Sequence, residues 1–456
     1  MDREAAKKNM TEGSLWDKLF SFALPLAATG ILQQLFNAAD IAVVGRCTGE
    51  AGQGAMAAVG ANSPIIGLIV NAFVGISLGT NVVIANAIGR GDRKTTGKAL
   101  HTSVVIAVIG GIFLALGGEL FAERILGSQK VPEDVLPMAV LYFRVYMTGI
   151  PVVLLYNFLA AVFRASGDTR TPLVVLVISG SLNVVLNLIF VLGLKRTVDG
   201  VAAATVISSC ISAVLLFVKL MKAEPPVRLE LKSLGIDGQV LKKILAIGIP
   251  AGVQSAVFSF ANIIIQAAIN SLGTVVMAAS SAAFNIEIFA YDVFNSFSQA
   301  CTTFVGQNYG AGRIDRCRRT MALCMVEGSI CLGATILLIL FFGRDILSVF
   351  NPDPAVIEVG YQRLVIIFSA YFFSMSYEVL SGYLRGFGIS VVPAIITMLC
   401  ICGTRISWIY LVFPKDPSFK NVMLVYPISL AATAVLMLIA VLVIRPAKKH
   451  MKQASA

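Results

Sequence analysis

Long apolar runs recur along the whole 456-residue chain and are separated by short polar segments. Each run has about twenty or more residues, which is long enough to cross a bilayer as a helix. We therefore predict an all-α integral membrane protein with about twelve transmembrane helices. The predicted spans are approximately Leu15–Val44, Ala55–Val83, Ala99–Phe121, Val135–Val162, Pro172–Leu194, Val201–Met221, Ile244–Leu272, Val275–Val305, Met321–Phe342, Val356–Leu384, Val391–Phe413 and Val422–Ile444.

The composition agrees with this interpretation. Hydrophobic residues make up 57% of the chain and charged residues only 13%, and the mean hydropathy is +0.84. Soluble domains are nearer a quarter charged. The eight cysteines show no paired CxxC spacing, so we expect neither a disulfide framework nor a resident metal site. No HExxH motif or nucleophile elbow is present, and we expect neither enzymatic activity nor a cofactor.

The net charge of +11 is distributed by loop. Lys and Arg crowd both termini and the loops after even-numbered spans, such as Arg90–Lys98 and Arg313–Arg319, while the odd-numbered loops carry most of the loop acids. The positive-inside rule therefore predicts a multi-pass protein of the cell membrane with both termini cytoplasmic. Because the basic residues form no single soluble patch, we expect no nucleic-acid partner.

The second half of the chain repeats the first. The segment around Pro25 aligns with that around Pro250, "AIGRGDRK" at 87–94 with "NYGAGRID" at 308–315, and "FRASGDTRTP" at 163–172 with "LRGFGISVVP" at 384–393. The offset is 225 residues for the first pair and 221 for the other two. With six spans per half, both halves enter the membrane from the same side, which predicts a parallel pseudo-twofold repeat of two bundles facing a central cleft.

The repeat also predicts the domain boundaries. We expect an N-lobe at 1–221 with spans one to six, and a C-lobe at 240–456 with spans seven to twelve and a basic cytoplasmic tail. The polar cytoplasmic linker 222–239 separates them.

With this repeat, the chain resembles the multidrug and toxic compound extrusion (MATE) family of cation-coupled antiporters. The resemblance rests on the two six-span halves, the Pro25 and Pro250 helices, "FVGQNYGAG" after the eighth span, and the paired "FRASGD" and "LRGFG" loops. It implies export of organic, often cationic, compounds by alternating access, driven by inward flow of sodium ions or protons.

The resemblance also implies a cation-coupling site in the N-lobe. By position, Asp40 matches the family's first-span acid, Asn183 its fifth-span Asn and Thr205 its sixth-span hydroxyl. Many relatives carry a second carboxylate where this chain has Asn187, a departure that puts sodium selectivity in doubt. The seventh-span acid of the family is also missing.

The residues around Asp40 support a function independently of the family. A carboxylate near the bilayer centre costs about 2.5–3.5 kcal/mol. Gln33 and Asn37 precede Asp40 at helical spacing, so the three form one polar stripe. The alternative is a structural carboxylate hydrogen-bonded inside the lobe. Asn183 and Asn187 also share a helix face. The structural alternative for these two residues is that their amides only hydrogen-bond one membrane helix to another.

Several polar side chains are predicted to line the substrate cavity: Gln33, Asn37, Asn157, Glu287, Asp292, Glu378 and Arg405. For the C-lobe members a structural alternative remains open, in which Glu378 or Glu287 forms a fixed ion pair with Arg405. Arg363 is expected near the outer end of its span, where a long side chain reaches the interface.

The sequence thus predicts a secondary antiporter that acts as a monomer among membrane lipids on small organic molecules. The alternative function is a flippase for a lipid-linked saccharide or peptidoglycan precursor, although such a cleft should be lined by several cations. Neither the substrate nor the choice between protons and sodium can be read from the residues.

Overall fold

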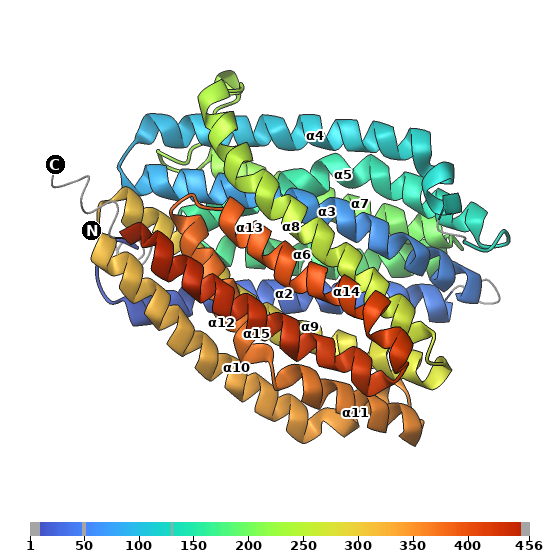
Figure 1. The fold of residues 1–456 in the computed structure, drawn as a ribbon. Coiled ribbons are helices and arrows are strands. Elements are labelled where there is room, and N and C mark those ends of the chain that lie inside the picture. The colour runs from blue at the N-terminus through green and yellow to red at the C-terminus, as the bar shows by residue number, and fades with distance from the viewer. Residues whose placement is uncertain (1–9, 48–51, 129–130, 448–456) are drawn as a thin grey trace. The chain divides into compact units, whose positions relative to one another are not determined.

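The computed structural model describes residues 10–47, 52–128 and 131–447, and within these ranges it is helical without strands (Figure 1). Among the described residues, eleven helical segments are long and apolar enough to cross a membrane, and there are twelve such spans when one bent helix pair is counted as a span. The predicted all-α class and the predicted spans are therefore confirmed. The helices of the first half are α2 (Leu15–Cys47), α3 (Gly52–Gly89), α4 (Arg93–Ser128), α5 (Leu136–Ala165), α6 (Arg170–Leu188) and α7 (Val198–Met221).

The second half has matching elements. These are α8 (Gly238–Asn270), α9 (Thr274–Gly310), α10 (Ile314–Phe350), α11 (Pro354–Phe368), α12 (Tyr371–Gly386), α13 (Val391–Thr397), α14 (Thr404–Leu411) and α15 (Phe419–Ile444). The pair α11 and α12 forms one span bent by 46°. Two π-helical segments, η2 (Ile189–Gly193) and η4 (Met398–Gly403), lie within the fifth span of each half, and short 3₁₀ turns occur at η3 (Leu231–Ser233) and η5 (Phe413–Lys415).

The backbone confirms the repeat predicted from the sequence. Helices α4 and α10 begin 221 residues apart, and so do α6 and α13, and α7 and α15. The turns repeat as well: Gly91 and Gly312 have φ of 70° and 71°, and Gly167 and Gly388 have φ of 91° and 83°. Because side chains disfavour this left-handed region, glycine is required at the same turn in both halves.

Two compact units make up the chain. The N-terminal unit consists of residues 28–248, and the C-terminal unit consists of residues 1–27 and 249–456. The division falls inside α2 and α8, close to Pro25 and Pro250, and differs from the linker boundary that the sequence predicts. The predicted basic tail lies outside the described residues from residue 448 onward.

The first turns of α2 belong to the C-terminal unit because their apolar face packs there. Leu19 and Phe22 are buried in its core, and the Phe22 ring meets the Phe304 ring edge to face at 5.5 Å. The segment before α2 is held by a hydrogen bond from Asn308 Nδ2 to the Met10 carbonyl oxygen, at 3.3 Å. The entry of α2 is thus part of the C-terminal unit's core.

The first turns of α8 belong to the N-terminal unit for a similar reason. Gly79 on α3 lies directly against the backbone at Ile244, and Gly248 on α8 lies against the backbone at Ile76. Larger side chains at these glycines would overlap the facing helix. This close backbone approach joins α8 to α3.

The linker is docked on the beginning of α4. His101 Nε2 accepts a hydrogen bond from the Glu230 backbone N–H at 3.1 Å, and Lys98 Nζ lies 2.6 Å from Asp237 Oδ2. The hydrogen bond from Lys98, followed by that from the Val240 backbone N–H, lowers the pKa of Asp237 below its ordinary value. The N-terminal unit therefore includes the linker.

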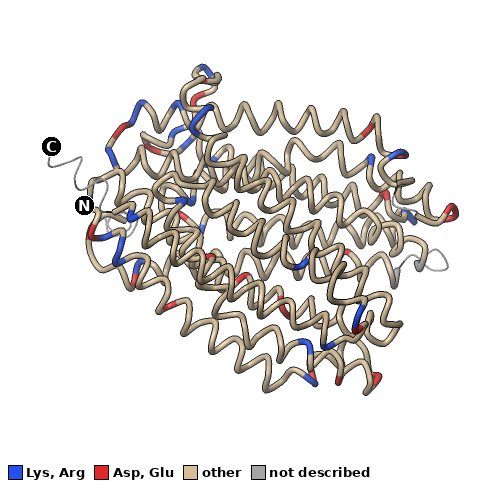
Figure 2. Tube along the Cα trace, in the orientation of Figure 1, with Lys and Arg blue, Asp and Glu red and all other residues tan. Residues whose placement is uncertain are grey.

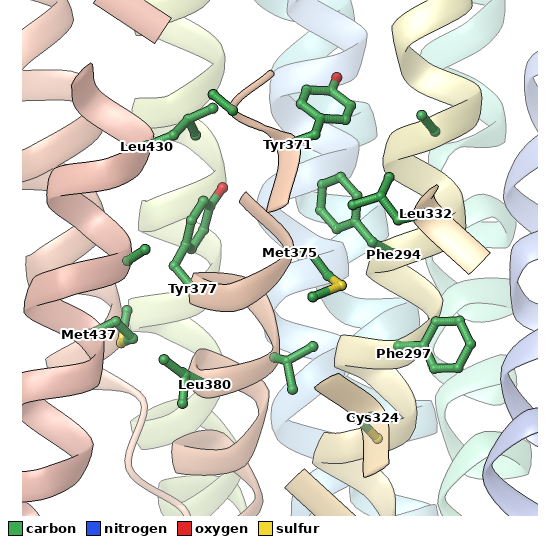
Figure 3. Packing of buried hydrophobic residues seen from close by; sticks show 14 of the residues in the cluster. Phe294, Phe297, Cys324, Leu332, Tyr371, Met375, Tyr377, Leu380, Leu430 and Met437 are labelled. Carbon is green, nitrogen blue, oxygen red and sulfur yellow. The ribbon is translucent and has the colours of Figure 1, made fainter. Parts of the chain in front are cut away.

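Figure 3 shows part of the apolar core of the C-terminal unit. Phe294 on α9 meets the Tyr371 ring edge to face at 5.6 Å, and Met375 lies beneath them. Most Lys and Arg residues lie at helix ends, whereas few charges occur along the helices (Figure 2). The charged residues inside the spans are therefore the candidates for functional residues.

Candidate functional site

The polar cluster around Asp40 joins three helices of the N-terminal unit. Asn187 Nδ2 on α6 donates to Asp40 Oδ1 at 2.6 Å, and Thr205 Oγ1 on α7 lies 3.4 Å from Asp40 Oδ2. Asn187 Nδ2 also lies 3.2 Å from Asn183 Oδ1, and Asn183 Nδ2 lies 3.4 Å from Thr205 Oγ1. The structure therefore brings together all four residues predicted for the cation-coupling site.

Local sequence explains how these residues meet. Asn183 and Asn187 lie one turn apart on α6, which continues into the π-helical segment Ile189–Gly193 just beyond them. One turn before Asp40, Phe36 packs on Gly180, where an added Cβ would overlap its ring. The missing side chain at Gly180 lets α2 approach α6 closely enough for the short amide and carboxyl groups to touch.

The environment of Asp40 is polar but carries no compensating cation. Asn183 and Asn187 are buried, and Asp40 is partly buried. Among the described residues, no Lys or Arg forms an ion pair with Asp40. Tyr142 and Tyr146 on α5 are close enough to interact with it electrostatically. In the part of the chain that the structure describes, its hydrogen-bond donors are therefore neutral groups.

The cluster offers oxygen atoms to a small cation. Asp40, Asn183 and Thr205 contribute oxygens, and Asn187 Oδ1 is buried without a hydrogen-bond partner in the described residues. A proton on the carboxylate or a sodium ion among these oxygens would supply the missing positive charge. The cluster thus surrounds one carboxylate with neutral oxygen ligands.

The remaining polar residues predicted for the first half are not part of this cluster. Gln33 and Asn37 are exposed on α2, and Asn157 is partly buried and donates to the Val153 carbonyl oxygen of its own helix at 2.9 Å. Their contact with substrate stays a prediction.

The structural alternative for the second half, an ion pair with Arg405, is replaced in the structure by a different pair. Glu287 on α9 binds Arg363 on α11 through two hydrogen bonds, with Nε–Oε1 2.6 Å and Nη2–Oε2 3.0 Å. Both side chains are buried. The partner of Glu287 is thus Arg363 rather than Arg405, and Arg363 does not reach an interface but is enclosed, because the α9 carboxylate compensates its charge.

The other charged residues of the second half make different contacts. Among the described residues, neither Glu378 nor Arg405 forms an ion pair, so the structural alternative that joins them does not hold. Glu378 interacts electrostatically with Arg385, and Arg405 donates to Asn262 Oδ1 at 2.9 Å. Asp292 is partly buried, and its Oδ2 atom has no hydrogen-bond partner in the described part of the chain.

Comparison with known proteins decides the family. The sequence matches the MatE family over residues 25–189 and 250–411, more than half of the chain and both of its halves. The chain belongs to the MatE family. It is 26% identical to the probable multidrug resistance protein YoeA of Bacillus subtilis, with 86% of each chain covered. It is 29% identical to the probable multidrug resistance protein NorM of Thermotoga maritima, covering 85% of this chain and 84% of the relative.

Solved structures share this MatE fold. A crystal structure of MATE in the straight conformation gives a TM-score of 0.88 at 20% identity, with 97% of this chain and 99% of the other covered. The outward-facing conformation of a multidrug resistance MATE family transporter gives a TM-score of 0.87 at 21% identity, with 96% of this chain and 98% of the other covered. The two-lobed fold is therefore that of MATE transporters, and the family favours efflux of small molecules over the flippase alternative.

In this MatE chain, sequence reasoning missed the pairing of Arg363 and did not name Tyr142 or Tyr146. Arg363 had no sequence signal for its pairing, because its partner lies 76 residues away on another helix. Tyr142 and Tyr146 could have been noticed as aromatic residues one turn apart on α5, with rings 6.2 Å apart. The sequence positions of Arg363, Tyr142 and Tyr146 do not indicate which helix their side chains face.

Proposed function

We propose that this chain is a secondary active antiporter of the cell membrane that exports organic compounds in exchange for protons or sodium ions. The observation that carries the proposal is Asp40, a carboxylate inside a membrane helix whose neighbours are neutral amides and a hydroxyl. Family membership supports transport, and the relatives named as multidrug resistance proteins support export of small molecules. The distribution of basic loops supports the further proposal that both termini are cytoplasmic.

Coupling follows from competition for one negative charge. An incoming cation neutralises Asp40 and is held by the oxygens of Asn183, Asn187 and Thr205. A substrate that needs the same charge is then released, and its return displaces the cation. Because the two states exclude each other, the cation gradient drives export through alternating access.

The substrate need not be a drug. One relative, 26% identical over 68% of this chain and 69% of its own, is named as an FAD transporter of Shewanella oneidensis. We propose small organic molecules with an aromatic or apolar body as the substrate class, because a cleft of apolar and aromatic side chains accepts varied ligands of that kind.

Dye efflux from proteoliposomes tests this function, with a pH gradient or a sodium gradient imposed alone. Asp40→Asn keeps the size of the side chain and removes the charge, so we expect a folded protein without gradient-driven efflux. Asp40→Glu retains the charge and should keep part of the activity. Asp134→Asn, an exposed acid in a loop of the same unit, is the matched control and should transport normally. Efflux by Asp40→Asn at the wild-type rate would rule out Asp40 as the coupling site.

A further inference from the structure

Arg405 on α14 is a buried cation whose hydrogen-bond partners are all neutral. Its side chain is 2% exposed. Nη1 donates to Asn262 Oδ1 at 2.9 Å, and Nε lies 3.5 Å from Ser429 Oγ. Within the described ranges no Asp or Glu lies at ion-pair distance from it. The guanidinium thus has hydrogen bonds without a counter-ion.

Two aromatic rings enclose the same guanidinium. The carbon Cζ of Arg405 lies 4.5 Å from the centroid of the Tyr426 ring and 5.3 Å from that of Phe258. Both rings and Asn262 are only partly buried. Arg405 is therefore buried next to aromatic and amide groups that are themselves partly exposed.

A second guanidinium lies near Tyr426, but its charge is already compensated. Arg363 Cζ is 5.6 Å from the centroid of the Tyr426 ring, and the Arg363 side chain binds Glu287 with two hydrogen bonds. Around this tyrosine there are thus two cations and one anion. The positive charge in excess is that of Arg405.

Glu378, which the structural alternative paired with Arg405, interacts with another group. Glu378 interacts electrostatically with Arg385, whose Nη2 donates to Gln254 Oε1 at 2.8 Å. Glu378 and Arg385 both lie on α12, and it is Arg385 that links α12 to α8. Arg405 keeps its uncompensated charge.

An uncompensated buried charge is costly in a protein interior and more so in a membrane span. Such a charge is understandable where a ligand supplies the missing anion. Guanidinium suits carboxylate and phosphate because its planar donors match two oxygens at once, and aromatic rings beside it suit an aromatic ligand.

We propose that Arg405, with Asn262, Phe258 and Tyr426, binds the carboxylate or phosphate group of an organic substrate in the C-terminal unit. This inference rests on the proposed export function and narrows its substrate class. Substrates carry an anionic group on an aromatic body, so zwitterions are favoured over simple cations. The Arg363–Glu287 pair holds the second cation beside Tyr426 in place without contributing free charge.

The test uses a matched pair of dyes, a rhodamine with a free carboxylate and its ethyl ester. Binding to the purified full chain in neutral nanodiscs is measured by fluorescence anisotropy, with empty nanodiscs subtracted. Loss of a charge-assisted hydrogen bond corresponds to a change of about ten-fold or more in Kd. We expect Arg405→Met to weaken binding of the carboxylate dye by about that factor and to change binding of the ester less than about two-fold.

Two further variants control for folding and for charge. Arg344→Met removes an exposed guanidinium that also stacks on a tyrosine, 4.1 Å from the Tyr361 centroid, but is paired with Glu358. It should leave both dyes unaffected. Arg405→Lys keeps the charge without the planar donors and should give an intermediate loss. Equal weakening of both dyes by Arg405→Met, or no weakening, would overturn the assignment, as would a wild-type chain that does not bind the carboxylate dye.

A lipid headgroup presents the same anionic chemistry, so binding is repeated with added phosphatidylglycerol. Competition by this lipid that disappears in Arg405→Met would assign the site to lipid and overturn the substrate inference. The proposed export function is judged separately by efflux of the ester dye and its loss in Asp40→Asn. Efflux with normal coupling but no carboxylate preference would therefore contradict only the inference about Arg405.

Discussion

Phe36 on α2 packs on the bare backbone of Gly180 on α6, one helical turn from the site on each helix. Asp40 follows Phe36 by four residues, and Asn183 follows Gly180 by three. The contact therefore sets the separation of the two helices at the height of the carboxylate. The polar cluster depends on an apolar contact that carries no charge.

Gly180→Ala tests this dependence. The added methyl group overlaps the Phe36 ring, so α2 and α6 must move apart, at a cost of about 1–3 kcal/mol. We expect gradient-driven efflux to fall strongly although Asp40 is intact. Gly67→Ala on α3 is the matched control because its Cβ would meet no atom within 4 Å. It should keep full activity and gain up to about 1 kcal/mol in stability, since alanine favours helix. Normal efflux by Gly180→Ala would show that helix spacing here is not critical.

Asn187→Asp places a second carboxylate beside Asp40. According to the family resemblance, many relatives carry a carboxylate at this position. Asp40 Oδ1 lies 2.6 Å from the Asn187 amide nitrogen, so a carboxylate oxygen in place of that nitrogen would bring two negative charges together unless a cation lies between them. We expect efflux to become more dependent on sodium. The measurement compares efflux under a sodium gradient alone with efflux under a pH gradient alone. Asn187→Leu, which removes the amide without adding charge, should show no such gain; an unchanged ratio in Asn187→Asp would contradict the prediction.

The Glu287–Arg363 pair should behave as a structural unit. Glu287→Gln leaves a buried guanidinium uncompensated, which costs about 3–5 kcal/mol of unfolding free energy. Adding Arg363→Met to this variant should restore part of the lost unfolding free energy. Unfolding in detergent, followed by circular dichroism, measures the coupling by a double-mutant cycle.

Glu378 and Arg405 provide the matched comparison for that cycle. Because they form no ion pair in the described part of the chain, Glu378→Gln and Arg405→Met should be nearly additive, with coupling below about 0.5 kcal/mol. Strong coupling between Glu378 and Arg405, together with weak coupling between Glu287 and Arg363, would reverse the assignment of the two arginines.

Protonation of Asp237 should release the linker from the start of α8. The pKa of Asp237 is lowered in the folded chain, first by Lys98 and then by the Val240 N–H. Its stabilising contribution is therefore present above its ordinary pKa of about 3.9 and is lost as the pH falls below that value. Hydrogen exchange at the Gln239 and Val240 amides, corrected for its intrinsic pH dependence, should increase on acidification. Asp237→Asn cannot titrate and should show no such change; if wild type and variant responded alike, the carboxylate would not be responsible.

The spans and the repeat could be predicted from the sequence because each depends on neighbouring residues. A helix satisfies its own backbone hydrogen bonds, and twenty apolar residues suffice to place it in a membrane. The glycine turns at Gly91 and Gly312 repeat for the same local reason, a backbone angle that other residues resist. Family position and helical spacing predicted the four residues around Asp40, and these residues contact one another in the structure, while their role in cation coupling stays a prediction.

The tertiary structure alone decided which buried groups meet. Hydropathy marks Glu287, Arg363 and Arg405 as costly in a membrane, but it contains no information on which faces of distant helices pack together. The choice of Arg363 as the partner of Glu287 follows from the packing of α9 with α11. The division within α2 and α8 has the same origin, since the apolar faces of their first turns pack beyond the predicted boundary. Span formation is local in the chain, whereas pairing of buried charges depends on contacts between residues far apart in sequence.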